Sequence, residues 1–184
     1  MRIVAGKFRG KTLLSPRDDS IRPTADRARE AIFNILSSRM GPVLDGRRVL
    51  DLFAGTGALG LEALSRGAAN VVFVDNSAEA RGLIRDHIEA FGAGGVTKLL
   101  RRDATELGPV GSMKPFDLVF LDPPYGKGLG ERALVSAKAG GWLAPGATIV
   151  LEESSEVELD LPEGFAEDHA RDYGAARVHF LSLA

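Results

Sequence analysis

Two rhythms of apolar residues alternate along the chain. The first is a 3.6-residue period between Thr24 and Met40, with apolar side chains at positions 28, 31, 32, 35, 36 and 40. This period predicts an amphipathic helix. Thr24 is the expected N-cap, because its hydroxyl can accept a hydrogen bond from a first-turn N–H group, and Gly41-Pro42 predicts the end of the helix.

The second rhythm begins near residue 48, where short apolar runs of strand length alternate with amphipathic segments. Strands are predicted over 49–53, 71–74, 96–101, 116–121 and 147–152, and helices over 58–66, 78–91 and 129–140. A Gly174 turn before 178–181 predicts a closing antiparallel pair, and segments 2–6 and 11–15 predict a short hairpin. The pattern predicts a Rossmann-like α/β fold, with a mostly parallel seven-stranded sheet and helices on both faces.

Composition narrows the class of protein. The chain has 184 residues and is 45% hydrophobic, which suits one well-buried domain. There is no secretory or membrane-spanning apolar run, so we expect a soluble cytoplasmic protein that does not contact membranes. The absence of cysteine excludes disulfides and thiolate chemistry. The three histidines are scattered, and His87 on an apolar helix face is expected to be a packed core residue, so no metal is expected.

Charge is distributed unevenly along the chain. The net charge is −2, but residues 1–30 carry eight basic and four acidic side chains, which leaves the remainder strongly acidic. The N-terminal end can therefore form a local positive patch that grips phosphates, although a solvated face without a partner is the alternative. The residues expected to contact RNA are Arg2, Lys7, Arg9 and Lys11.

A glycine-rich turn follows the first predicted core strand. Residues 55–60 read Gly-Thr-Gly-Ala-Leu-Gly, which matches G-x-G-x-x-G, and Asp75 ends the next strand 20 positions after Gly55. Since one β-α-β unit brings such a turn and acid together, Asp75 is expected to bind the ribose hydroxyls of an adenosine. The motif alone fits a nicotinamide dinucleotide as well as S-adenosylmethionine, and a tight turn without a ligand is the structural alternative.

Three features favour S-adenosylmethionine as the cofactor. Asp51 lies within the first core strand, where its carboxylate suits a cationic amino group better than a pyrophosphate. Asp103-Ala104 follows the third strand, where a carboxylate can contact the adenine amino group. A dehydrogenase of this length would also have little room for a separate substrate domain.

The stretch Asp122-Pro123-Pro124-Tyr125 follows the fourth predicted strand. The Asp122 carboxylate and a prolyl carbonyl can each accept a hydrogen bond from one planar amino group, and the prolines stiffen the loop. Tyr125 offers a face on which a base can stack. The stretch indicates group transfer to the exocyclic nitrogen of a nucleobase, with Asp122, Pro123 and Tyr125 as catalytic residues. An ordinary strand-ending turn is the alternative.

Together these motifs resemble the class I S-adenosylmethionine-dependent methyltransferases. They are more closely similar to the bacterial RsmD-type enzymes, which methylate the N2 amino group of one guanine in 16S ribosomal RNA. The resemblance spans nearly the whole chain and rests on segments 2–6, 22–34, 50–67, 122–125, 141–143 and 178–181. Its most specific part is Arg-Pro-Thr-Ala-Asp-Arg-Ala-Arg-Glu over residues 22–30, whereas the acidic tail after residue 153 departs from the family pattern.

The resemblance implies a role for each cofactor residue. Thr24 and the start of its helix would lie over the methionine end, and Asp75 would hold the ribose. The amino-acid moiety would be held by Asp51, Ala54, Gly55 and Gly57, with Phe53 and Thr56 of the same turn also lining the cofactor. The residues implied for the adenine are Asn76, Asp103 and Ala104.

The resemblance also implies an organisation and a partner. We expect one domain, in which residues 1–42 contact RNA and cover the cofactor and residues 43–184 form the catalytic core. The expected substrate is 16S ribosomal RNA or an assembling small ribosomal subunit, and the expected state is a monomer. A methyltransferase of adenine N6 or of a protein glutamine is one alternative, which the family-specific stretch at residues 22–30 disfavours. A non-catalytic RNA-binding assembly factor is another, which the intact Asp122 and Tyr125 disfavour.

Overall fold

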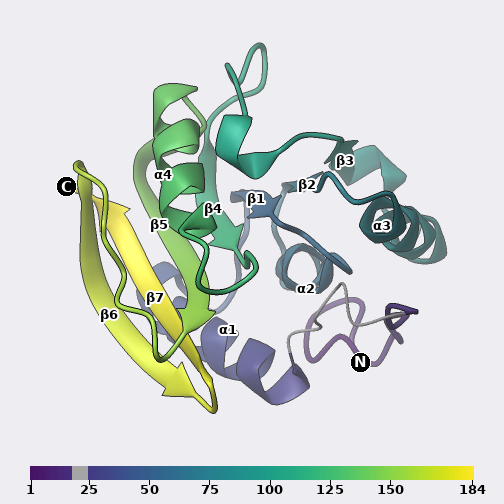
Figure 1. Cartoon of the computed structure of the whole chain (residues 1–184). Coiled ribbons are helices and arrows are strands. Elements are labelled where there is room, and N and C mark those ends of the chain that lie inside the picture. The colour runs from purple at the N-terminus through teal and green to yellow at the C-terminus, as the bar shows by residue number, and fades with distance from the viewer. Residues whose placement is uncertain (18–24) are drawn as a thin grey trace.

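A single seven-stranded sheet runs through the protein (Figure 1), as seen in a computed structural model that describes residues 1–17 and 25–184. The strands are β1 (Arg48–Leu52), β2 (Asn70–Val74), β3 (Thr97–Leu100), β4 (Phe116–Leu121), β5 (Leu143–Ser154), β6 (Phe165–Tyr173) and β7 (Ala176–Leu183). Their order in the sheet is β3-β2-β1-β4-β5-β7-β6. Strands β1 to β5 are parallel, and β7 is antiparallel to both β5 and β6.

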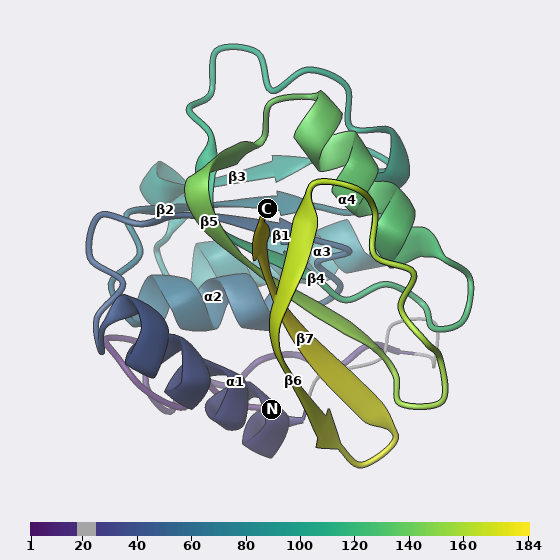
Figure 2. The same cartoon turned by 90° about the vertical axis from the view of Figure 1, so that its left-hand side faces the viewer.

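Helices cover both faces of this sheet. They are α1 (Asp26–Met40), α2 (Ala58–Ser65), α3 (Ala78–Ala90) and α4 (Leu129–Ala139), with short 3-10 turns η1 (Gly94–Val96) and η2 (Ala104–Glu106). Figure 2 shows α1 and α2 below the sheet and α4 above it. Alternate strand residues serve the two faces, because side chains along a strand point to opposite sides. Val49 thus joins the buried cluster of α1, α2 and α3, and Leu50 joins that of α4.

The predicted fold is confirmed, and most predicted element boundaries agree within a few residues. The N-terminal hairpin is smaller than a pair of strands, with one antiparallel bridge between Arg2 and Thr12. Helix α1 begins at Asp26 after Ala25, and the predicted N-cap Thr24 lies outside the described residues. At its other end Gly41 has a φ of +93°, a left-handed conformation that favours glycine and ends the helix as predicted.

The N-terminal segment, residues 1–17, is fixed to α2. The buried Glu62 accepts a hydrogen bond from Val4 N–H at 2.9 Å, and Ser65 Oγ accepts one from Phe8 N–H at 2.9 Å. Gly6 approaches α2 so closely that a Cβ on it would lie 1.9 Å from the Ser65 carbonyl oxygen. The Glu62 carboxylate also lies 3.6 Å from Arg29 Nε, so the same helix holds α1.

The arrangement of the strands gathers the predicted site residues at one edge. The chain passes from β1 outward to β2 and β3 and then returns to β4 on the other side of β1. Ligands of open α/β sheets bind beyond the carboxyl ends of the strands at such a reversal point. The motifs after β1, β2, β3 and β4 all occupy that edge.

Candidate active site

The glycine turn between β1 and α2 has an unusual backbone. Gly55 and Gly57 have φ values of +60° and +79°, and Phe53, at +54°, is a positive-φ residue that is not glycine. Left-handed non-glycine residues are costly and cluster at functional sites. Two backbone hydrogen bonds hold the turn, from Ala54 N–H to Val74 O at 3.1 Å and from Gly57 N–H to Ala54 O at 2.8 Å.

Asp75 lies against this turn, as its spacing predicts. One carboxylate oxygen accepts a hydrogen bond from Gly55 N–H at 2.9 Å, and the other accepts one from Ser77 N–H at 2.9 Å. The acid therefore organises the turn in addition to any contact with a ribose. Each carboxylate oxygen can accept more than one hydrogen bond, so these contacts leave it able to bind hydroxyl groups. The neighbouring Asn76 is exposed.

Asp51 is a buried carboxylate beneath the turn. It is 1% exposed and accepts a hydrogen bond from Gly60 N–H at 3.0 Å. Burial raises the pKa of Asp51 well above its ordinary value, the nearby Asp75 charge acts in the same direction, and the Gly60 hydrogen bond opposes them. Gly60 itself allows α2 to approach the sheet, since a Cβ there would lie 2.5 Å from Phe73 Cε1. A cation placed beside Asp51 would relieve the cost of its buried charge.

Asp103 and Ala104 follow β3 at the same edge. Asp103 caps the short turn η2 and accepts hydrogen bonds from Thr105 N–H at 2.8 Å and from the Thr105 hydroxyl at 2.7 Å. These hydrogen bonds lower the pKa of Asp103. Asp103 is exposed and Ala104 is buried, so the carboxylate is the part of this pair that faces solvent.

The loop after β4 begins beside the glycine turn. Asp122 N–H points to Leu52 O at 3.5 Å, which ties the start of this loop to the end of β1. Pro123 is buried and Pro124 exposed. The half-buried Tyr125 donates its hydroxyl hydrogen to a carboxylate oxygen of Glu152. The loop and the turn are therefore neighbours across one pair of parallel strands.

Two site residues that the sequence reasoning missed are Glu152 and Glu153 at the end of β5. Glu152 holds the Tyr125 hydroxyl, and the buried Glu153 accepts a hydrogen bond from Gly126 N–H at 3.0 Å. The available signal was their position at the end of the strand predicted over 147–152. The structure adds the neighbour, because the parallel pairing of Leu121 with Leu151 places Asp122 beside Glu152. Acidic residues at the end of a strand adjacent to a catalytic loop are candidates for supporting that loop.

The four predicted RNA-contacting side chains, Arg2, Lys7, Arg9 and Lys11, are all exposed. Arg2 lies apart from the other three, with its backbone N–H 3.4 Å from a carboxylate oxygen of Asp26 at the start of α1, and Lys7, Arg9 and Lys11 do not lie at the carboxyl edge. Residues 7–9 form a turn beside Ser65, and Lys11 Nζ contacts the Ala90 carbonyl at 3.4 Å, so this basic turn lies at the C-terminal ends of α2 and α3. At 1.5 Å per residue, the length of α2 separates it from the glycine turn by about 12 Å.

Comparison with known proteins places the chain in a family. The family described as "Conserved hypothetical protein 95" matches residues 1–182. "Ribosomal RNA small subunit methyltransferase D" of Escherichia coli K12 is 38% identical over 162 residues, covering 88% of this chain and 78% of that protein. The chain belongs to the RsmD family. The protein of the same name from Haemophilus influenzae is 32% identical, with 90% of this chain and 84% of that protein covered.

Solved structures agree with this placement. The Escherichia coli protein yhhF has the same fold with a TM-score of 0.82 and 31% identity, and the match covers 100% of this chain and 97% of that one. The predicted class I methyltransferase fold is thus confirmed for this RsmD-type protein. The individual cofactor, catalytic and RNA contacts assigned from the sequence stay predictions.

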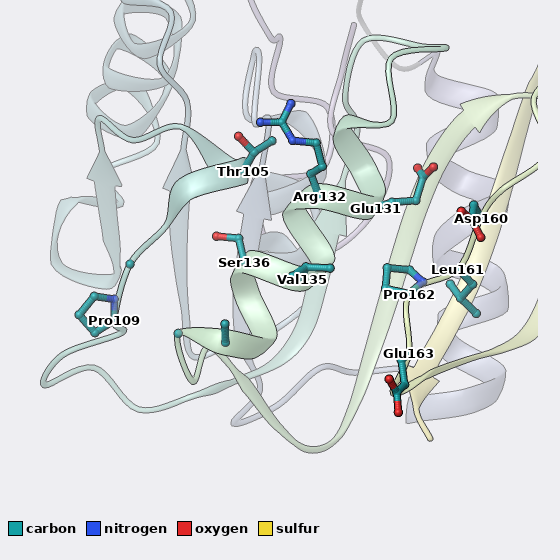
Figure 3. A pocket seen from close by; sticks show the side chains of 13 residues that line it. Thr105, Pro109, Glu131, Arg132, Val135, Ser136, Asp160, Leu161, Pro162 and Glu163 are labelled. Atoms are coloured by element: carbon teal, nitrogen blue, oxygen red, sulfur yellow. The ribbon is translucent and has the colours of Figure 1, made fainter.

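A separate cavity of about 950 Å³ lies along α4 (Figure 3). Its walls come from α4, from the segment around Thr105 to Pro109 and from the loop at 160–163. Glu131, Asp160 and Glu163 give it a largely acidic rim. It contains none of the glycine-turn or Asp122 loop residues, and it borders the predicted adenine end of the candidate site through Thr105, which bonds Asp103.

The described residues contain neither a cluster of metal-ligating side chains nor a membrane-spanning helix. Among residues 1–17 and 25–184, no group of three or more His, Asp or Glu side chains is placed to hold a metal ion. No helix in the described part of this RsmD-type chain is both long and apolar enough to cross a membrane.

Proposed function

We propose that the protein transfers a methyl group from S-adenosylmethionine to the exocyclic N2 amino group of a guanine in 16S ribosomal RNA. Membership of the RsmD family supports an rRNA small-subunit methyltransferase. The observation that carries the proposal is the pairing of two loops at the reversal point of the sheet. The glycine turn follows β1, and the Asp122 loop follows the adjacent β4, with Asp122 N–H directed to the last carbonyl of β1.

The residues around the glycine turn fit S-adenosylmethionine. Asp51 is a buried carboxylate that a ligand's ammonium group would stabilise, and Asp75, which bonds Gly55 N–H of the glycine turn, would also accept hydrogen bonds from the ribose hydroxyls. Asn76, Asp103 and Ala104 would border the adenine. When bound, S-adenosylmethionine would supply an electrophilic methyl group attached to a positively charged sulfur. The role of Thr24 over the methionine end stays part of the proposal.

The Asp122 loop would prepare the nucleophile. The amino lone pair of guanine is delocalised into the ring, which makes the nitrogen a poor nucleophile. Hydrogen bonds from this amine to Asp122 and to a prolyl carbonyl would favour a pyramidal nitrogen with its lone pair directed at the methyl group. Alignment of this kind contributes about 7–11 kcal/mol in favourable cases.

Charge and stacking would complete the reaction. The nitrogen would become cationic as its bond to the methyl carbon forms and the bond from that carbon to sulfur breaks, with S-adenosylhomocysteine as the leaving group, and the carboxylate of Asp122 would stabilise that charge. Asp122 or water then takes the proton. The target base must leave its stack to enter the loop, and the ring of Tyr125, held by Glu152, would replace the lost stacking.

Within this proposal the chain is one domain with two tasks. Residues 1–42 would contact RNA through Arg2, Lys7, Arg9 and Lys11, and residues 43–184 would carry the cofactor and the chemistry. The basic turn lies about one helix length from the glycine turn. The RNA must therefore extend along α2 and α3 in order to reach both the basic turn and the Asp122 loop.

The test is incubation of the protein with methyl-labelled S-adenosylmethionine and separate pools of RNA, DNA and protein. Label is expected in 16S ribosomal RNA, and nucleoside analysis should identify it as N2-methylguanosine. Label in N6-methyladenosine or in protein glutamine would replace the proposed acceptor. Cofactor and RNA binding without any transfer would favour an assembly factor.

A further inference from the structure

His87 contacts both the N-terminal segment and the glycine turn. It lies in the last turn of α3 and is 2% exposed, as expected of a packed core histidine. Its Nε2 lies 2.7 Å from Leu14 N, and its Nδ1 lies 2.9 Å from the Thr56 carbonyl oxygen. The imidazole ring therefore connects two segments. One is the strap, residues 14–17, which leads on from the basic turn, and the other is the glycine turn.

The two neighbours fix the protonation of the ring. A backbone N–H group can only donate, so Nε2 must be an unprotonated acceptor of the Leu14 hydrogen bond. The hydrogen then resides on Nδ1, which donates to the Thr56 carbonyl. Burial lowers the pKa of His87, while the Thr56 hydrogen bond and the Asp86 charge oppose that effect. The neutral tautomer satisfies both contacts at once.

A second contact ties the same strap to α3. Arg17 N–H donates to a Glu79 carboxylate oxygen at 3.0 Å, three residues beyond Leu14. Glu79 is in the first turn of α3, two residues after the N-cap Ser77. The backbone N–H of Ser77 in turn donates to Asp75. Residues 14–17 thus run along α3 toward the cofactor edge. Before the strap, Lys11 of the basic turn contacts the other end of α3, where its Nζ lies 5.1 Å from the centre of the Phe91 ring.

We propose that His87 is a positioning residue that couples cofactor binding to RNA binding. A ligand that orders the Thr56 peptide would also fix the imidazole, and the imidazole would fix Leu14 and the strap that carries the basic turn. Energetic coupling of this kind is reciprocal, so RNA would also raise the affinity for the cofactor. The inference rests on the proposed function, because it assumes that the glycine turn binds S-adenosylmethionine and the basic turn binds RNA.

Two substitutions break the connection at opposite ends. In His87→Asn the side-chain amide nitrogen can still donate to the Thr56 carbonyl, but nothing accepts the Leu14 N–H. In His87→Gln the amide oxygen can reach the Leu14 N–H, but the contact with Thr56 is lost. Glu89→Gln is the matched control, because Glu89 is an exposed residue of the same helix. The readout is the dissociation constant for a 16S ribosomal RNA transcript with and without S-adenosylhomocysteine, which binds without turnover.

In the unsubstituted protein, S-adenosylhomocysteine is expected to tighten RNA binding by about fivefold or more. Glu89→Gln should keep that ratio, whereas both His87 variants should bring it close to one. A merely structural role would weaken both RNA affinities alike and leave the ratio unchanged. Equal RNA affinities with and without S-adenosylhomocysteine in the unsubstituted protein, or His87 variants that keep its ratio, would overturn the coupling alone.

Two further observations distinguish a failure of the proposed function from a failure of the coupling through His87. Failure of the unsubstituted protein to bind S-adenosylhomocysteine, or to bind either 16S ribosomal RNA or small ribosomal subunits, would remove the proposed function, and the coupling with it. Hydrogen exchange of the Leu14 amide needs no variant and serves if the substitutions unfold the chain. The amide should exchange several-fold more slowly when S-adenosylhomocysteine is bound, and an unchanged rate would overturn the inference.

Discussion

The two halves of the candidate site are held together differently. In the cofactor half, at the ends of β1 to β3, carboxylates bond the backbone itself, as Asp75 does with Gly55 N–H and Asp51 with Gly60 N–H. In the acceptor half, at the ends of β4 and β5, Glu153 also bonds the backbone, at Gly126 N–H, but a bond between two side chains positions the ring of Tyr125. The cofactor half is therefore part of the folded backbone, whereas in the acceptor half the ring of Tyr125 can be altered without breaking a backbone hydrogen bond.

This difference has a functional consequence. Substitutions in the cofactor half should change cofactor affinity and fold stability together, because the same carboxylates serve both. Substitutions in the acceptor half should change transfer to RNA and leave cofactor affinity intact. The comparison fails if the two sets of variants behave alike.

The largest effect is expected for Asp122→Asn. The substitution keeps the size of the side chain and removes the charge that would stabilise the cationic nitrogen. Loss of one such electrostatic contact typically lowers the catalytic rate by about 10²–10³-fold. Single-turnover methylation of 16S ribosomal RNA measures this loss, with thermal melting as a check on folding. Near-normal transfer would remove Asp122 from the acceptor half.

Asp51→Asn should weaken S-adenosylhomocysteine binding by roughly 10–100-fold, because a hydrogen bond to a charged group contributes about 1.5–3 kcal/mol. Calorimetry measures the affinity. The amide oxygen can still accept the Gly60 hydrogen bond, so the fold should persist.

The same variant carries a prediction for stability against pH. Burial raises the folded-state pKa of Asp51 above its ordinary value of 3.8. The folded state therefore binds this proton more tightly than the unfolded state, and stability contributed by the protonated form is lost as pH rises from about 4 through the raised pKa. Asp51→Asn should flatten that part of the profile in thermal melts. An identical slope in both proteins would mean that Asp51 is not desolvated.

Two substitutions of Tyr125 distinguish the stacking of a base on its ring from the positioning of that ring by its hydroxyl. Tyr125→Ala should raise the Michaelis constant for RNA by roughly 10-fold or more, since stacking of a base on an aromatic ring contributes about 1–3 kcal/mol. Tyr125→Phe keeps the ring and removes the hydroxyl that bonds Glu152, so about a fivefold effect is expected. Steady-state kinetics on 16S ribosomal RNA compare the two. Equal losses in both variants would show that the hydroxyl, and not the ring, is what matters.

The smallest effect is expected from the basic turn. Replacement of Lys7 and Arg9 by Ala should weaken RNA binding a few-fold at physiological salt and flatten its salt dependence, by about 0.7 in log–log slope per lost phosphate contact. Lys11 is left in place because its ammonium group also packs on Phe91. Replacement of the exposed Lys98 and Arg171 is the charge-matched control. Equal salt slopes for the two double variants would make the turn an ordinary solvated face.

The sequence predicted some parts of this site more completely than others. The pairing of Asp75 with the glycine turn follows from local chain geometry, because one strand-helix-strand unit brings them together. The support of Tyr125 by Glu152 could not be read in the same way, since it depends on which strand lies beside β4. His87 was correctly expected to be buried, but its two hydrogen bonds depend on where the N-terminal segment folds back, which no local pattern records.

The rate of methyl transfer to 16S ribosomal RNA, followed against S-adenosylmethionine concentration in the unsubstituted protein, Asp51→Asn and Asp122→Asn, tests the division of the site most directly. Asp51→Asn should need roughly 10–100-fold more cofactor and then approach the plateau rate of the unsubstituted protein. Asp122→Asn should reach half-saturation at an unchanged concentration with a plateau lowered by about 10²–10³-fold. A lowered plateau for Asp51→Asn at unchanged half-saturation, or a rescue of Asp122→Asn by added cofactor, would contradict the assignment of the two halves.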